Sequence, residues 1–585
     1  MLSSAPANPR RRTAVPIAIG VTSHRNIPAR EEAAVRARIC ELFAVLWTEF
    51  PDLPLLVISA LAEGGDQWVA EEALAGGVRL VAPLPMTRAQ YAQDFATAAS
   101  RARFDGLCDR AEIIELEDLG EDAGDGETNF SSASERDRRY ANAGIYVSAH
   151  CHILLAIWDG KETDLLGGTA QIVRYHLSGL KPATLERRQN SGKASLLSND
   201  HQRLLYHIVC SRDAADGSPA APLQPLQTFW RVAGSVLPGA GPMPGEFHAM
   251  FAQTCEFNAD RAKYQARIDA REALRPANAD GATQASPSVL DGLFHAADWL
   301  ALHFQRRVLF AMRTLYTLAA LMGIAFTVYD NLPAQDEMLN VFLLLFALGG
   351  LVVVIANRRS WHRKYLDYRA LAEGLRVQSY WRRAGISLTG DPEFARDNFL
   401  QKQDVELGWI RNAMRSAALE SAFCVRQNPA LELHSVIREW VGDTEQGGQL
   451  EYYQRKAAQR ARTHRVTEAI GAAALCVGIG ISVVLALLAS QLSADAKNSL
   501  VVAMAVFSIV GAVREAYAYK KADKELIKQY RFMQRLFVDA RAALDRSANP
   551  VEQREILRLL GEAALAEQVE WALMHRQRPL EHARF

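Results

Sequence analysis

The sequence has few residues that could cross-link it or hold a metal ion. Its 585 residues include seven cysteines, and no two of them have the spacing of a Cys-x-x-Cys pair. This argues against a zinc ribbon or a disulfide scaffold and is typical of buried thiols in a reducing compartment. The first residues, MLSSAPANPRRRTAVP, are polar and basic without an apolar stretch, so we expect no cleaved signal peptide.

The chain also lacks an excess of either charge. Lysine and arginine total 66, aspartate and glutamate total 66, and the formal net charge is zero. A general nucleic-acid binder needs clustered positive charge to displace counterions, so no nucleic-acid partner is expected. At roughly 150 residues per domain, the length predicts three or four domain-sized units.

The first part of the chain alternates short β-branched runs with helical stretches. Five largely apolar runs are expected to be strands buried on both faces of a parallel sheet: 15–21, 53–61, 78–84, 111–117 and 151–158. The run 204–211 could be a sixth strand. Helices are expected between them at 29–50, 66–75 and around 87–103. The alternation predicts an α/β, Rossmann-like, doubly wound domain over residues 13–211.

Four apolar segments lie in the second half of the chain, in two pairs: 314–329 with 338–356, and 469–489 with 500–513. A helix that spans a bilayer needs about 20 apolar residues, with a range of about 17–25. The second and third segments reach that length, whereas the first and fourth need flanking residues to reach the membrane surface. A buried core hairpin is the alternative for the short segments. We expect four transmembrane helices in two hairpins, because each short segment lies one turn from a long one.

Basic residues indicate how these hairpins are oriented. Arginine and lysine cluster before and after each pair, whereas Lys497 is the only basic residue within either turn. The positive-inside rule therefore places both termini and all large polar segments in the cytoplasm.

Each hairpin is expected to continue into a cytoplasmic helix with a narrow apolar seam. The seam residues recur every three or four positions: Tyr365, Tyr368, Ala372, Leu375 and Ser379, and then Leu526, Tyr530, Met533, Phe537, Ala540 and Leu544. The repeated unit suggests an internal duplication. The expected domains are 13–211, a linker with short helices rich in Pro, Gly, Ala and Ser at 212–288, a first hairpin unit at 289–440 and a second at 450–580.

Polar residues follow three of the predicted strands, at the edge where parallel sheets bind ligands. Glycine pairs let backbone amides approach a phosphate, and an arginine can bind it with two hydrogen bonds. The candidate ligand-binding residues are Gly20, Thr22, Ser23, His24, Arg25, Ser59, Glu63, Gly64, Asp66, Asp159, Gly167, Gly168 and Thr169. Each has a structural alternative, as a turn, a loop histidine or a helix cap. Their convergence on one edge favours a crevice for a phosphate or a nucleotide.

These motifs resemble the SLOG superfamily, Rossmann-like domains related to the LOG cytokinin-activating hydrolases and the DprA family. The resemblance rests on GVTSHR (20–25), SALAEGGDQWVAEEAL (59–74) and ILLAIWDG…GGTAQIV (153–173). The apolar pairs, with YRALAEGLR (368–376) and EQVEWALMHRQRP (567–579), resemble SLATT domains, two-transmembrane effectors that accompany SLOG sensors in bacterial conflict systems.

The resemblance covers residues 13–211 and roughly 289–580. It implies a sensor-effector of antiphage defence in the inner (cytoplasmic) membrane. A nucleotide-derived ligand would bind the SLOG-like domain, and the SLATT-like helices would form or gate a membrane-disrupting pore. Its expected partners are the lipid bilayer, that small molecule and further copies of the chain, with no metal or other cofactor.

One departure bears on enzyme activity. The LOG hydrolases carry a PGGxGTxxE motif with a catalytic glutamate, whereas this chain has LLGGTAQIV with Ile172 at that position. An apolar side chain cannot transfer a proton, so a ligand-binding effector is expected rather than an enzyme. Glu63 or Asp66 could serve another reaction, and the alternative is a membrane-tethered nucleotide or NAD hydrolase. A transporter is disfavoured, because the apolar segments hold almost no ionisable residues.

Overall fold

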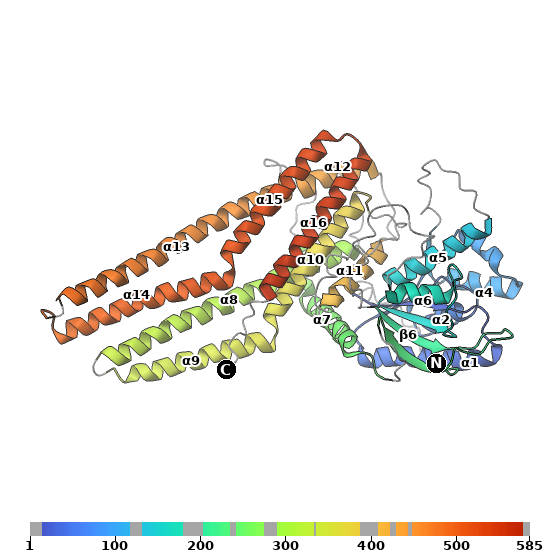
Figure 1. Cartoon of the computed structure of the whole chain (residues 1–585), viewed down its shortest axis with the longest axis horizontal. Coiled ribbons are helices and arrows are strands. Elements are labelled where there is room, and N and C mark those ends of the chain that lie inside the picture. The colour runs from blue at the N-terminus through green and yellow to red at the C-terminus, as the bar shows by residue number, and fades with distance from the viewer. Residues whose placement is uncertain are drawn as a thin grey trace. The chain divides into compact units, whose positions relative to one another are not determined.

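The computed structural model describes residues 14–116, 132–178, 203–234, 241–273, 289–332, 335–386, 407–421, 429–442, 447–488 and 490–576 (Figure 1). These residues form two compact units. The first unit contains the described residues within Met1–Ala297, Leu371–Arg382 and Ser387–Gln427. The second contains the described residues within Asp298–Ala370, Arg383–Ile386 and Asn428–Phe585.

The first unit is built on a seven-stranded sheet. Its strands are β1 (Ile17–Ser23), β2 (Leu55–Ile58), β3 (Arg79–Leu84), β4 (Glu112–Glu115), β5 (Ile153–Trp158), β6 (Leu204–Val209) and β7 (Thr228–Val232). Their order is β4-β3-β2-β1-β5-β6-β7, and every pair is parallel except β6 with β7. The six predicted strands and the Rossmann-like sheet are confirmed. The antiparallel strand β7 lies within the segment expected to be a linker.

Helices pack on both faces of this sheet. Residues of α5 (Ser132–His150) and α6 (Thr169–Ser178) share one apolar cluster with β1, β2, β3 and β5. The chain moves the opposite way along the sheet through α1 (Ala29–Glu49), α2 (Gly65–Ala75), α3 (Arg88–Tyr91), the 3-10 helix η2 (Ala92–Asp94) and α4 (Ala98–Cys108). Since parallel crossovers are right-handed, these helices cover the other face, where α2 packs against α1 and α4.

Two further helices pack near the amino end of the sheet. The segment expected to hold short helices forms one long helix, α7 (Gly245–Ala273), because buried residues that recur every three or four positions, from Phe247 to Arg261, form a continuous face. Asn258 of α7 bonds both backbone groups of Val15, just before β1, at 3.1 and 3.0 Å. Helix α11 (Gly408–Ser421) packs against α7 and α5, and the rings of Phe257 and Trp409 lie 5.7 Å apart.

The rest of the chain is helical. In order, it forms α8 (Val289–Asn331), α9 (Glu337–Arg358), α10 (Trp361–Arg383), α12 (Pro429–Val436), the π-helix η7 (Ile437–Val441), α13 (Gly448–Leu488), α14 (Ala494–Lys521), α15 (Asp523–Arg546) and α16 (Pro550–Arg576). Of the described residues, α8, α9, α13 and the segment from α14 through α15 contain four stretches long and apolar enough to cross a membrane. The predicted apolar segments lie in these helices, apart from residue 489, which is outside the described residues.

Helices of the second unit pack at two levels. Along the apolar stretches, the Tyr316 hydroxyl of α8 donates to the carbonyl of Ala516 in α14 at 3.3 Å, and Gly323 faces Ile509. Outside them, Leu366 of α10, Leu526 of α15 and Trp571 of α16 share an apolar cluster. The seam predicted for residues 526–544 is largely buried: Leu526, Met533, Phe537, Ala540 and Leu544 are each at most 9% exposed.

Candidate functional site

The strand order defines a switch point between β1 and β5. From β1 the chain builds the sheet outward to β4, and then returns through α5 to place β5 on the other side of β1. Ligands of open α/β sheets bind beyond the carboxyl ends of the strands at such a point. His24 directly follows β1 and Asp159 directly follows β5, so two predicted site residues lie at this position.

A buried histidine–aspartate pair joins the two strand ends. His24 Nε2 lies 3.0 Å from Asp159 Oδ1, and the two side chains are 10% and 1% exposed. The same Asp159 oxygen accepts the backbone N–H of Lys161 at 3.0 Å. Burial alone would raise the pKa of Asp159, but the adjacent His24 side chain and the hydrogen bond from the Lys161 N–H outweigh it and hold that pKa below its usual value. Nearby, the Thr169 hydroxyl donates to the carbonyl of Ser23 at 2.8 Å, so the third predicted motif meets the first.

Asp66 is a buried carboxyl group at the start of α2, in the second predicted motif. Its residue is 4% exposed, and Oδ1 is buried without a hydrogen-bond partner among the described residues. Burial raises the pKa of Asp66 from 3.8 to about 7, against the opposing effects of the Ser23 hydroxyl and the positive charge of Arg25. Near neutral pH this carboxyl group can therefore donate or accept a proton.

Four side chains next to Arg25 were not predicted from the sequence. The Arg25 guanidinium lies over the Tyr140 ring, 4.9 Å from its centroid. The Tyr140 hydroxyl donates to Asp94, which also pairs with Arg136. The fourth, Tyr91, has a fully buried hydroxyl without a partner among the described residues, and burial raises its pKa well above 10. Tyr91 and Asp94 follow β3, so extending the strand-end rule to that strand would have found them.

The glycine pair in the second motif has a structural role. Gly64 has a φ of +93°, and a Cβ there would lie 2.5 Å from the carbonyl oxygen of Arg25 and 2.8 Å from that of His24. A Cβ on Gly65 would lie 2.8 Å from the Cβ of Ser23. These glycines therefore let the loops after β1 and β2 touch.

The other glycine pair uses its amides within its own turn. The N–H of Gly167 donates to Gln171 Oε1 at 2.6 Å, and that of Gly168 donates to the carbonyl of Leu165 at 3.0 Å. Both groups are thus engaged in this structure. An anion would be served better by the N-terminus of α2 and by Arg25, because the first amides of a helix lack intrahelical acceptors.

The remaining predicted residues lie in the strands or in the loops that follow them. Gly20 lies inside β1, where a Cβ would be 2.8 Å from side-chain atoms of Val147 and Cys151, so it packs under α5 rather than at the strand end. Ser59 is fully buried and accepts the N–H of Leu61 at 3.1 Å. Thr22, the second-to-last residue of β1, is 9% exposed. Glu63 accepts the Ser100 hydroxyl at 2.6 Å.

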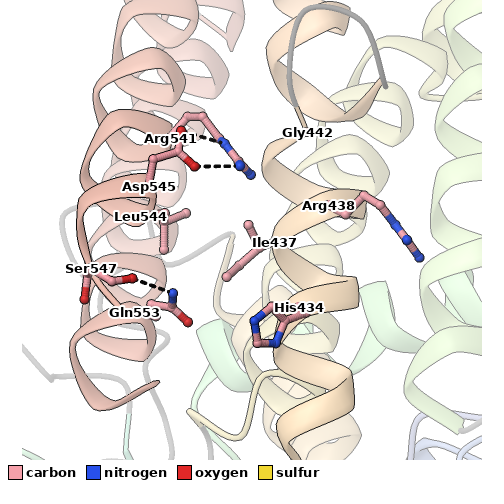
Figure 2. Close-up of a pocket in the computed structure, with 9 residues that line it drawn as sticks. All are labelled: His434, Ile437, Arg438, Gly442, Arg541, Leu544, Asp545, Ser547 and Gln553. Atoms are coloured by element: carbon pink, nitrogen blue, oxygen red, sulfur yellow. Dashed lines mark hydrogen bonds and ion pairs between the residues drawn. The ribbon is translucent and has the colours of Figure 1, made fainter. Parts of the chain in front are cut away.

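A separate cavity of about 480 Å³ lies in the second unit, between α12–η7 and the junction of α15 with α16 (Figure 2). Arg541 makes two hydrogen bonds to Asp545, at 3.2 and 2.6 Å, whereas Arg438 extends from η7 away from that pair. Asp545 is the only acidic residue in the lining and is paired with Arg541, so nothing in this cavity favours a cation.

Comparison of the chain with protein-family models, with curated proteins and with solved structures found no match. The described residues also contain no group of three or more His, Cys, Asp or Glu side chains placed to hold a metal ion. The chemistry of this edge of the sheet therefore rests on its own geometry. It combines a buried histidine–aspartate pair, a carboxyl group with a pKa near 7 and a surface arginine on a tyrosine ring.

Proposed function

We propose that this protein is a membrane-anchored sensor-effector. A nucleotide-derived ligand binds at the carboxyl edge of the sheet, and the apolar helices of the same chain form or gate a membrane-disrupting pore. The observation that carries the proposal is the set of buried polar atoms around the switch point. Asp66 Oδ1 and the Tyr91 hydroxyl have no partner among the described residues, and buried polar groups are normally satisfied. A ligand that carries hydroxyl and phosphate groups would satisfy them beside Arg25.

The membrane arm of the proposal rests on helix length and apolarity. Four stretches reach the length of a membrane span, and the flanking basic residues favour two hairpins whose turns face away from the cytoplasm. With both termini cytoplasmic, the sheet would meet cytoplasmic metabolites. The resemblance to SLOG and SLATT domains supports a role in bacterial conflict, in an oligomer in the inner membrane.

Topology reporters test the membrane arm directly. Fusions at the N-terminus, at the C-terminus and within residues 420–450 should all report cytoplasm, and a fusion at residue 333 should report the opposite side. An exported 420–450 segment would mean that one of the shorter apolar segments does not span.

Ligand capture tests the sensor arm. Native mass spectrometry of the detergent-purified chain should show a bound phosphate-bearing species, and Arg25→Gln should reduce its occupancy about tenfold by removing a charged contact. Arg30→Gln, five residues further along and also exposed, is the matched control and should retain the species. Equal ligand occupancy in the two variants would mean that Arg25 does not bind the ligand.

A tethered hydrolase is the second candidate, and Asp66 specifically favours it. A carboxyl group with a pKa near 7, beside Ser23 and Arg25 at the end of β1, has the properties of a general acid or base. Incubation of the purified chain with NAD and a panel of nucleotides distinguishes the two functions. New products that disappear in Asp66→Asn would favour the hydrolase, and unchanged substrates would favour the sensor.

A further inference from the structure

Helix α5 extends from the candidate ligand crevice to the region where α11 packs. Its 19 residues carry Arg136 and Tyr140 toward the crevice, and it ends at His150, just before β5. At about 1.5 Å per residue, Tyr140 and His150 lie about 15 Å apart along the helix. One rigid element therefore connects the carboxyl edge of the sheet to its amino edge.

At the crevice end, close backbone contacts couple α5 to the predicted motif 167–169. A Cβ on Gly167 would lie 2.9 Å from the backbone N of Ala141 and 3.0 Å from the Cβ of Tyr140. Nearer the middle of α5, a Cβ on Gly144 would overlap the side chain of Ile172. Because packed interiors transmit displacements rather than absorb them, a shift of this turn must move α5.

At the other end, α11 is held by hydrogen bonds to the residue that precedes β5. His152 Nδ1 accepts the N–H of Ala18 at 3.1 Å, so Nε2 carries the proton and donates to the carbonyl of Asn412 at 3.0 Å. Ser416 Oγ lies 3.3 Å from the same nitrogen. Burial, with the charge of Arg415, lowers the pKa of His152 to about 3, so this neutral tautomer persists at physiological pH.

Helix α11 occupies a particular position in the chain. Helix α11 lies between α9 and α13, and thus separates the first pair of apolar helices from the second. Leu419 of α11 is fully buried and belongs to the same apolar cluster as Tyr146 and Val147 of α5. The sheet unit therefore holds the chain at the point between the two helix pairs.

We infer that α11 is a latch whose docking is controlled through α5 by the state of the crevice. Movement of the 167–169 turn shifts α5, loosens α11 and frees the two helix pairs to rearrange. This inference rests on the proposed function for its biological meaning, but the coupling itself can be tested without the ligand.

The test is backbone hydrogen exchange of the full-length chain in detergent. Gly167→Ala places a methyl group against α5, and Gly234→Ala is the control, because Gly234 also has a positive φ, +77°, but no atom within 4 Å of its Cβ position. We expect amides of α11 to exchange about tenfold faster, relative to those of β2, in Gly167→Ala, and to change no more than those of β2 in Gly234→Ala. Unchanged exchange in α11, or an equal increase in β2, would overturn the inference.

A second variant keeps the test open if Gly167→Ala does not fold. Tyr140→Phe removes only the hydroxyl that bonds Asp94, and it should accelerate exchange in α11 about threefold, again with β2 unchanged. Exchange in α11 at the wild-type rate would contradict the inference.

Dye leakage then separates the latch from the proposed function. Leu419→Ala should loosen α11 and cause leakage from reconstituted vesicles without ligand. Vesicles that stay sealed, although exchange in α11 responds to Gly167→Ala, would count against the proposed pore and leave the latch standing.

Discussion

Strand β5 and helix α9 use the same kinds of side chain in opposite surroundings. All six residues of β5, ILLAIW, are buried. In α9, Leu343, Leu344 and Phe346 are 55%, 61% and 53% exposed. A soluble protein rarely leaves so continuous an apolar surface open to water. The sheet finds its apolar surroundings within its own chain, whereas α9 requires them from outside, and a lipid bilayer supplies them.

The largest expected effect comes from placing charge on α9. Replacing Leu344 and Leu348 with arginine costs about 3 kcal/mol each if these side chains face lipid, and almost nothing if they face water. We expect the double variant to be lost from the membrane fraction after carbonate extraction. Phe310→Arg is the control, since Phe310 is 67% exposed but precedes the apolar segment. If both variants remain in the membrane fraction, these side chains of α9 do not face lipid.

The next largest effect should come from Gly64, in the tightly packed unit. Gly64→Ala combines a positive φ with a Cβ that meets two carbonyl oxygens, so we expect a loss of about 3 kcal/mol or more in the free energy of unfolding. The control is Gly234→Ala, which has the backbone strain alone and should cost about 1 kcal/mol. Thermal unfolding of the detergent-purified chain measures both. Equal losses would show that the loops after β1 and β2 are not closely packed.

The contrast between these regions also explains what the sequence could predict. Most residues of β1, β2, β3, β5 and β6 are apolar and buried because both faces of the sheet are covered, so these strands are visible without the fold. The edge strand β4, EIIE, is apolar only at its centre. Strand β7 lies antiparallel beside β6, and its sequence TFWRV contains arginine and follows a proline-rich stretch, so it gives no such signal. The apolar helices are visible because each contains a stretch that is apolar over the length of a membrane span.

The site was predictable where it depends on strand order and not where it depends on packing between distant elements. His24, Asp66 and Asp159 follow or adjoin strand ends, and a parallel sheet brings such ends together. Tyr140 reaches Arg25 from a helix more than 100 residues later, and no local pattern encodes that contact. The structural role of Gly64 was similarly hidden, because it depends on the carbonyl groups of another loop.

Asp66 should make the sheet unit sensitive to pH. Below pH 4 the group is protonated in both the folded and the unfolded chain, so Asp66→Asn should change little. Between pH 4 and 7 only the unfolded chain ionises, so the wild-type protein loses stability as pH rises, by about 1.4 kcal/mol for each unit of pKa difference. Above pH 7 the penalty is complete, and Asp66→Asn should be more stable by a few kcal/mol. Parallel curves of melting temperature against pH for the two proteins would contradict a raised pKa.

The smallest effect should come from glycines within the apolar helices themselves, and it tests which of their faces meet protein. A Cβ on Gly323 of α8 would lie 3.0 Å from Ile509 of α14, whereas one on Gly480 of α13 would have no atom within 4 Å. If lipid covers the open faces, Gly480→Leu should insert normally and leave the melting temperature in detergent nearly unchanged. Gly323→Leu must separate α8 from α14 and should cost about 1–3 kcal/mol, as overpacking does in a protein core. Equal stability of the two variants would mean that α8 and α14 do not pack as the structure shows. A larger loss for Gly480→Leu would instead place a protein neighbour, rather than lipid, on that face of α13.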